Sequence, residues 1–191
     1  LIVAPIVVGL IGLIVERLII RFLYGRMIDT MLATWGLSLF LIGAVTMIFG
    51  SSAVNVPTPI PGYALGSYQM GGYNLFIIFV AIAVVVGLWL VLRYTRIGLI
   101  ARGAMQNADV ASSLGYKPKV VYMITFTAGA ALAGLAGGVL APLTGLLPTS
   151  GGAYIAKAFI TIVTGGAAVI AGTLSSSVIF GVISQVVSFA S

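Results

Sequence analysis

The sequence predicts an all-α, polytopic transmembrane helix bundle, and its composition and hydropathy pattern support this fold class. Of its 191 residues, 61% are hydrophobic and 6% are charged, and the mean hydropathy is +1.24. These values lie far outside the range of soluble globular domains. The apolar residues form several runs long enough for an α-helix to cross a hydrocarbon core about 30 Å thick.

The first half of the chain predicts two spans. Residues 1–15 form an apolar run that fits the inner end of a span. Residues 16–29 mix three arginines and two acids with apolar side chains, which predicts an amphipathic segment in the cytoplasmic interface. Residues 30–49 are uncharged and predict a second span. Residues 50–72 are rich in proline and glycine and carry no charge, as is typical of an ordered external loop.

Two further spans follow. Residues 73–92 form an apolar run with Trp89 as an anchor near its inner end. Residues 120–141 form the next run, and in it Gly134 and Gly138 make a GxxxG pair. This spacing is typical of a close helix contact, but it is also common in membrane helices that make none, so both interpretations stay open. Residues 142–152 predict a second uncharged external loop.

The basic residues predict which side of the membrane each loop faces. Eight of the nine lie in the two assigned inner loops, residues 16–29 and 93–119, and Lys157 lies elsewhere. Positive charge marks the cytoplasmic side of a membrane protein. The net charge of +6 therefore reports topology and contact with lipid headgroups, and it does not indicate nucleic acid binding.

The inner loop 93–119 contains a predicted short helix with signals at both ends. Asn107 is a suitable N-cap, Asp109 suits the positive end of the helix dipole, and Gly115 suits a left-handed C-terminal position. Pro118 prevents the helix from continuing into the next run. Such a helix is either a docking element for a soluble partner or an interfacial helix on lipid headgroups, and composition leaves both open.

The stretch 153–191 predicts one glycine-interrupted helix. Gly165, Gly166 and Gly172 either break it into two half-helices, as in transporters that expose backbone groups to a solute, or allow close packing of a continuous helix. The candidate residues of a solute path or gate are Lys157, Thr161, Thr164, Gly165 and Gly166. Threonines in membrane helices more often bond their own backbone, and Lys157 near the outer end favours an interfacial anchor that snorkels.

Several classes of function are disfavoured. The chain has no cysteine and no histidine, so we expect no metal site and no catalytic residue. It has no GxxxxGK[ST] motif for ATP, so we expect no cofactor and no enzymatic activity. A secondary transporter or channel for a small neutral solute stays open as an alternative. Ion-coupled transporters often carry intramembrane acids, whereas Glu16, Asp29 and Asp109 are all assigned to inner loops.

Several segments, in a fixed order, resemble one family over essentially the whole chain. They are ERLIIRFLYGR, TRIGLIARGAMQNADVASSLG, TFTAGAALAGLAGGVLAP, and KAFITIVTGG followed by AGT. In this order and spacing they resemble permease subunits of bacterial ABC importers for branched-chain amino acids, and for urea and related amides. The chain departs from the family where it reads GGAAVIAG, since Ala168 and Val169 replace a Gly-Ser pair that the family commonly has.

The resemblance implies a subunit of a larger importer in the bacterial inner membrane. Residues 1–191 would form a single permease domain, incomplete at both ends, that moves a small neutral or zwitterionic solute by alternating access. The implied partners are a second, homologous or identical permease, ATP-binding subunits that use the ATP, and a periplasmic solute-binding protein. The implied coupling helix, which would contact the ATPase, consists of Asn107, Ala108, Asp109, Val110, Ala111, Ser112, Ser113, Leu114 and Gly115.

Overall fold

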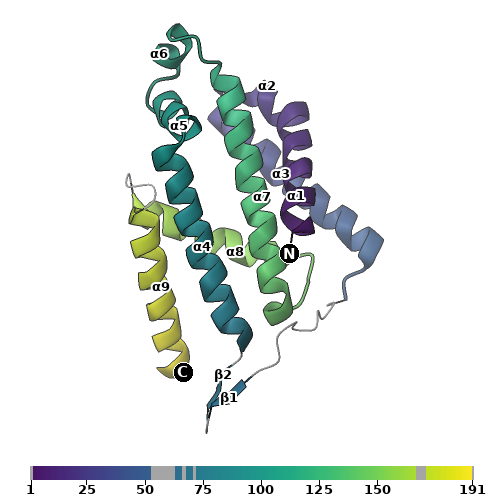
Figure 1. Ribbon diagram of the computed structural model, residues 1–191. Helices are drawn as coiled ribbons and strands as arrows, with labels where there is room; N and C mark the ends of the chain where they lie inside the picture. Colours follow the sequence, from purple (N-terminus) through teal and green to yellow (C-terminus); the bar gives the residue numbers. More distant parts are fainter. Residues whose placement is uncertain (1, 53–62, 66–67, 71, 167–170, 191) are drawn as a thin grey trace. The chain divides into compact units, whose positions relative to one another are not determined.

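The computed structural model describes residues 2–52, 63–65, 68–70, 72–166 and 171–190, which form two compact units, Leu1–Leu146 and Leu147–Ser191 (Figure 1). In the first unit the elements are α1 Val3–Val15, the π-helical turn η1 Glu16–Ile20, α2 Arg21–Leu23, α3 Met27–Phe49, β1 Tyr63–Leu65, β2 Tyr68–Met70, α4 Gly72–Tyr94, α5 Arg96–Gln106, α6 Ala108–Ser113 and α7 Pro118–Thr144. In the second unit they are α8 Ser150–Gly165 and α9 Ala171–Ala190.

Four helical stretches of the described chain are long and apolar enough to cross a membrane: Val3–Leu23, Ile28–Phe49, Gly72–Tyr94 and Pro118–Thr144. The last three confirm the spans expected at 30–49, 73–92 and 120–141 to within three residues at each end. The all-α, multi-spanning fold class is therefore confirmed. Between α3 and α4, β1 and β2 pair as two short antiparallel strands that the sequence did not predict.

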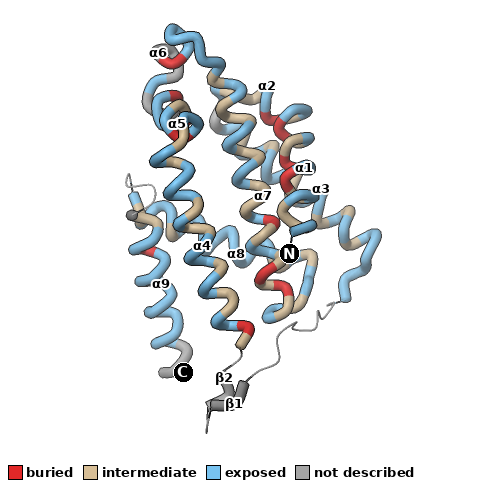
Figure 2. Tube along the Cα trace, in the orientation of Figure 1, coloured by how far each residue is buried: buried red, intermediate tan, exposed pale blue. Residues whose placement is uncertain are grey.

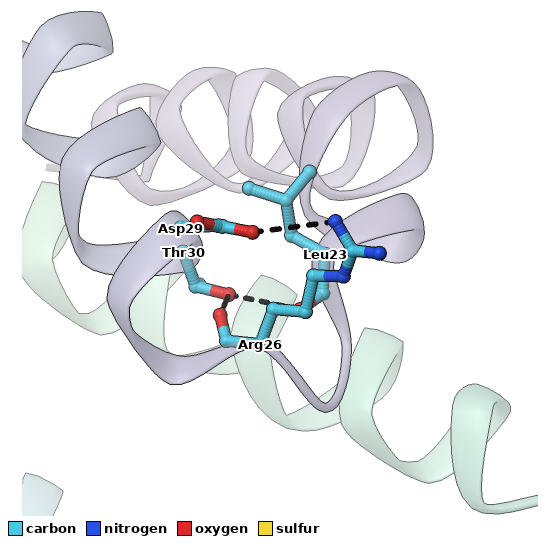
Figure 3. Close-up of polar contacts among 4 residues, drawn as sticks. All are labelled: Leu23, Arg26, Asp29 and Thr30. Carbon is cyan, nitrogen blue, oxygen red and sulfur yellow. Dashed lines mark hydrogen bonds and ion pairs between the residues drawn. The ribbon is translucent and has the colours of Figure 1, made fainter.

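The first span differs from its prediction, because the helix does not end at Val15. It continues through η1 and α2 as far as Leu23, so residues 16–23 extend the first helix and residues 27–29 begin α3, where the sequence predicted one separate amphipathic segment. The interfacial position of residues 16–29 stays a prediction. A tight turn then leads into α3 (Figure 3). The Thr30 hydroxyl donates hydrogen bonds to the carbonyls of Leu23 and Arg26, at 3.0 and 2.8 Å, and stabilises this turn.

Asp29 lies in the first turn of α3, where a carboxylate interacts favourably with the helix dipole. One of its oxygens is 3.6 Å from the Arg26 guanidinium (Figure 3). Both side chains are at least half exposed, so the pair contributes little to stability.

The core of the first unit is the contact between α1 and α7. The two helices cross with small residues facing each other: Gly9 and Gly12 of α1 lie against Ala131 and Ala130 of α7, and Gly134 of α7 lies against Ala4 and Val8 of α1. Small side chains allow such close approach of two membrane helices. Gly138 also lies near Ala4, so the predicted GxxxG pair does mark a close helix contact, and it is a contact within this chain.

A buried tyrosine links α4 to the same core. The Tyr73 hydroxyl donates a 2.7 Å hydrogen bond to the carbonyl of Val139, and both residues are buried. Elsewhere the spans have extensive apolar surface, as the pale faces of α3 and α4 in Figure 2 show. Exposed apolar surface of this extent is suited to lipid or to other membrane subunits.

Candidate functional site

The connection between α4 and α7 is built from two short helices rather than one. The first, α5, has Thr95 as its N-cap: the Thr95 hydroxyl accepts a 3.2 Å hydrogen bond from the amide of Gly98. Its buried residues, Gly98, Ala101 and Ala104, recur every three positions and form its inner face. The sequence offered the Thr95 cap and this spacing as signals, but only the second helix was predicted.

The second helix, α6, confirms the predicted capped helix in backbone geometry. Gly115 has φ +84°, which is the left-handed conformation expected of it. The Tyr116 amide donates to the carbonyl of Ala111, and the Gly115 amide donates to that of Ser112, at 3.2 and 3.0 Å. This pair of bonds is the Schellman motif, which ends a helix at a glycine.

The residues of the expected coupling helix fall on and around α6. Asn107 precedes it with an extended backbone (φ −155°, ψ 105°), as an N-cap requires, and its carbonyl accepts from the Ala111 amide. Ala111 is buried, whereas Ser112, Ser113 and Gly115 are exposed. Leu114 is 71% exposed, so an apolar side chain protrudes at the end of the helix. The side chains of Ala108, Asp109 and Val110 lie outside the described residues.

The sequence predicted that all three acids lie in inner loops, and for Glu16 this prediction is wrong. Glu16 lies in η1, within the helical stretch Val3–Leu23, and only 1% of it is exposed. One carboxylate oxygen accepts a 2.7 Å hydrogen bond from the Tyr24 hydroxyl. The other, Oε2, has no hydrogen-bond partner among the described residues. A charge count along the sequence locates this acid near the end of a span but does not show that a π-helical turn buries it.

Tyr24, one residue past the end of that span, is held in its protonated form. Burial raises the pKa of its hydroxyl well above the ordinary value, and the hydrogen bond to the Glu16 carboxylate raises that pKa further. Its ring also contacts the ring of Tyr122 in α7, with centroids 5.2 Å apart. Tyr24 therefore acts as a hydrogen-bond donor that fixes one Glu16 oxygen.

The second unit confirms a helix break. α8 ends at Gly165, Gly166 has φ +62°, and α9 begins at Ala171. The backbones of Gly165 and Gly172 touch, since a Cβ built on Gly165 would lie 2.9 Å from the Gly172 carbonyl carbon. The buried Ser176 hydroxyl donates a 2.9 Å hydrogen bond from α9 to the Thr161 carbonyl in α8. Ala168 and Val169, where the chain departs from the family pattern, lie outside the described residues.

The candidate solute-path residues all lie on α8 or at its end. The Thr161 hydroxyl donates to the Lys157 carbonyl and the Thr164 hydroxyl to the Ile160 carbonyl, both at 2.8 Å. Thr34 and Thr125 bond carbonyls of their own helices in the same way. These bonds agree with the structural interpretation of the threonines. The candidate coupling and solute-path residues thus lie in different units of the chain.

Comparison with known proteins identifies the class. The family model described as the permease component of branched-chain amino acid transport systems matches residues 1–191. The chain belongs to this family.

Curated relatives agree with the match. The chain is 32% identical over 186 residues to the high-affinity branched-chain amino acid transport system permease protein BraD of Pseudomonas aeruginosa, which covers 93% of this chain and 60% of BraD. It is 31% identical over 154 residues to LivH of Salmonella typhimurium, covering 77% of this chain and 50% of LivH. The chain thus spans about half the length of the curated relatives it matches. No solved structure matches it significantly.

Family membership shows that this permease is a multi-pass membrane protein and a transport component rather than an enzyme. The burial of Glu16 places an acid within one of the membrane-length helical stretches, which the sequence did not predict.

Lys157 provides a test of the outer end of α8. Its exposed side chain lies in the third turn of the helix, and we expect it to snorkel to the headgroups as an anchor. Lys157→Met and Lys157→Arg permeases should therefore insert normally and transport with solute affinity within about twofold of wild type, because neither change removes the apolar stem. Uptake assays at matched membrane levels measure this. A well-inserted Lys157→Met protein that does not transport would instead place the ammonium at the solute path.

Proposed function

We propose that this chain is the translocating part of an ATP-driven importer for branched-chain amino acids, and that α6 is the element that contacts the ATPase subunit. The observation that carries the proposal is the capped helix α6, which lies past the ends of α4 and α7 (Figure 1) and has Leu114 exposed at its end. The chain belongs to a permease family throughout its length. An apolar side chain on a short, sharply ended helix is suited to a complementary cleft in a soluble partner.

The packing around α6 supports a mechanical role. α5 contacts α4 on one side and α7 on the other, and α6 contacts both α5 and α7. A displacement of α6 would therefore act on two spans at once. α7 in turn packs against α1 through small residues, so a movement of its inner end would reach the first span. This arrangement is suited to alternating access driven from outside the chain.

The solute class rests on the family and on the charge of the spans. Glu16 lies about two turns before the end of its helical stretch, and the other charged residues of the four stretches lie near their ends, which favours a neutral or zwitterionic solute. A branched-chain amino acid is the favoured solute, with urea or a related amide second. The break at Gly165 and Gly166 is the proposed gate, since a helix end there leaves backbone groups free to contact a solute. A second permease subunit and a periplasmic binding protein complete the proposed importer.

The coupling proposal predicts that Gly115→Val strongly reduces solute-stimulated ATP hydrolysis. Valine is strained at φ +84°, so the end of α6 should shift while the distant spans remain folded. The measurement is leucine-stimulated ATPase activity of the full-length permease reconstituted with its ATPase and binding protein, and we expect stimulation to fall by about tenfold or more, as for a lost contact worth at least about 1.4 kcal/mol.

Gly115→Asn is the matched control, because asparagine tolerates the left-handed region, and it should retain most of the stimulation. Normal leucine-stimulated ATPase activity in a complex with correctly inserted Gly115→Val permease would show that α6 is not the coupling element. Absence of leucine stimulation in the wild-type complex, with stimulation by urea or an amide, would keep the coupling proposal and change the solute.

A further inference from the structure

A cavity of about 690 Å³ lies where the first span ends and α7 begins, and basic side chains line it. Its lining comes from η1 and α2, and from the end of α6, the turn that follows and the first turns of α7. Positive charge marks the cytoplasmic side of a membrane protein, but that rule does not bring segments far apart in the sequence together around one cavity. The four cations of the lining, all exposed, are Arg17, Arg21, Lys117 and Lys119.

These four cations give the cavity an excess of positive charge. In the part of the chain that the structure describes, the one ion pair joins Arg26 to Asp29, so none of the four is paired with an acid there. Glu16 also lines the cavity, but its carboxylate is buried and accepts a hydrogen bond from Tyr24. A ligand with a net negative charge is therefore favoured, and a phosphate group suits arginine and lysine side chains.

A second cavity, of about 320 Å³, adjoins the basic one and is mostly apolar. The two cavities share four lining residues at the turn between α6 and α7: Gly115, Tyr116, Lys117 and Val120. The remaining residues of the second cavity are aliphatic and come from α5 and from the membrane-length helix α7: Ile97, Ile100, Val121 and Ile124. A cavity suited to an anion thus lies next to one suited to a hydrocarbon chain.

We propose that the two cavities together bind an anionic phospholipid, with its phosphate among the four cations and an acyl chain along the aliphatic residues of α5 and α7. The apolar cavity favours a lipid over a soluble phosphate compound, because only the lipid has a chain that removes this apolar surface from water. Basic pockets between transmembrane helices on the cytoplasmic side are suited to phospholipid headgroups, and the charge rule places this end of the helices on that side.

The site has a structural consequence for the connection that carries α6. A bound lipid would contact the end of the first span through its phosphate, and α5 and α7 through its chain. It would thereby stabilise the position of α6 relative to the spans without being transported. The proposal concerns lipid binding, so it does not rest on the identity of the solute or on the ATPase contact.

Exchange of the headgroup tests the proposal on the unmodified protein. The full-length permease is purified in detergent, depleted of lipid and titrated with phosphatidylglycerol or with phosphatidylcholine of the same acyl chains, while thermal unfolding is followed. Both lipids have the phosphate, but the choline ammonium cancels its charge. We expect phosphatidylglycerol to bind about tenfold more tightly or more, the effect of one or two basic residues near an anionic lipid. Equal stabilisation by the two lipids would overturn the proposal.

Two double variants assign the phosphate contact. The variant Arg17→Gln, Arg21→Gln removes two cations of the cavity and should lose most of the preference for phosphatidylglycerol. The matched control is Arg96→Gln, Arg102→Gln, which removes the same charge from residues that line neither cavity and should keep the preference. The preference compares two lipids on the same protein, so a change in stability alone does not alter it. Equal losses in both variants would show that the basic surface as a whole attracts the lipid, and the assignment to this cavity would be wrong.

A second pair of variants tests the acyl-chain contact. Ile124→Ser places a hydroxyl group in the apolar cavity and should weaken phosphatidylglycerol binding by about threefold or more, because less apolar surface is buried against the chain. Ile78→Ser is the matched control, since Ile78 is an exposed isoleucine of the membrane-length helix α4 and lines neither cavity. Equal binding by the two variants would show that no acyl chain lies in the apolar cavity.

Two further results would identify a different ligand. If glycerol phosphate, the headgroup without its chains, stabilised the permease as strongly as phosphatidylglycerol at the same concentration, the cavity would be a site for a soluble phosphate compound. If the variant Arg17→Gln, Arg21→Gln kept its lipid preference but no longer copurified with the ATPase subunit, these arginines would contact that protein. Either result would show that the lipid proposal is wrong.

Discussion

Gly134→Val is expected to separate α1 from α7 and to destabilise the folded permease by about 1–3 kcal/mol, the usual cost of overpacking a tight contact. A Cβ built on Gly134 would lie 2.7 Å from the Cβ of Val8 and 2.8 Å from the carbonyl oxygen of Ala4. The second of these atoms is backbone, so no rotamer change can relieve the clash and the helices have to move apart. The measurement is the melting temperature of the full-length permease in detergent, together with its folded yield.

Gly137→Val is the matched control on the same helix. Gly137 has nothing within 4 Å of its built Cβ, so the added side chain enters open space. Both variants add the same volume and the same β-branched side chain to α7, and differences in helix propensity cancel. A fall in melting temperature of similar size in both variants would show that the α1–α7 contact does not determine the stability of this unit.

The glycine pattern of α7 illustrates how far the sequence alone can lead. The GxxxG spacing of Gly134 and Gly138 indicated a face suited to close packing. It did not identify the partner helix, because the partner, α1, lies more than 100 residues earlier in the chain and the pattern there, Gly9 and Gly12, has a different spacing. Composition also does not distinguish Gly134 from Gly137. The two glycines differ only in the side of α7 that each one faces.

The connections between the helices also contain some features that the sequence predicts and others that it does not. Hydropathy located three spans, and the residues at the ends of α6 predicted its left-handed Gly115 correctly, because both signals are local. The burial of Glu16 was missed because it depends on the π-helical turn and on the Tyr24 hydroxyl, eight residues away. The break after α8 stayed open at the level of sequence. Its glycines suit either a kinked or a packed helix, and the contact of Gly165 with Gly172 decides between them.

Gly98→Ala is expected to disturb the loop that carries α6 while leaving the spans inserted. At this position the first turn of α5 touches the last turns of α4: a built Cβ would lie 2.5 Å from the Cα of Leu92 and 2.6 Å from its carbonyl carbon. Both atoms are backbone, so even a methyl group pushes α5 away from α4. The displacement also strains the cap, in which the Gly98 amide donates to Thr95. We expect a local cost of about 1–3 kcal/mol and a marked loss of leucine-stimulated ATP hydrolysis in the reconstituted complex.

Gly103→Ala on the same helix should not destabilise α5. Its built Cβ meets nothing within 4 Å, and alanine favours a helix over glycine by about 0.8–1.0 kcal/mol, so α5 should be as stable as before or more so. Amide hydrogen exchange of residues 96–106 measures both effects directly, with faster exchange expected in Gly98→Ala and equal or slower exchange in Gly103→Ala. Equal amide exchange in α5 and normal leucine-stimulated ATP hydrolysis in both variants would contradict this prediction. In that case the contact of α5 with α4 would not hold α6 in place, and movement of α6 would reach the spans through α7 alone.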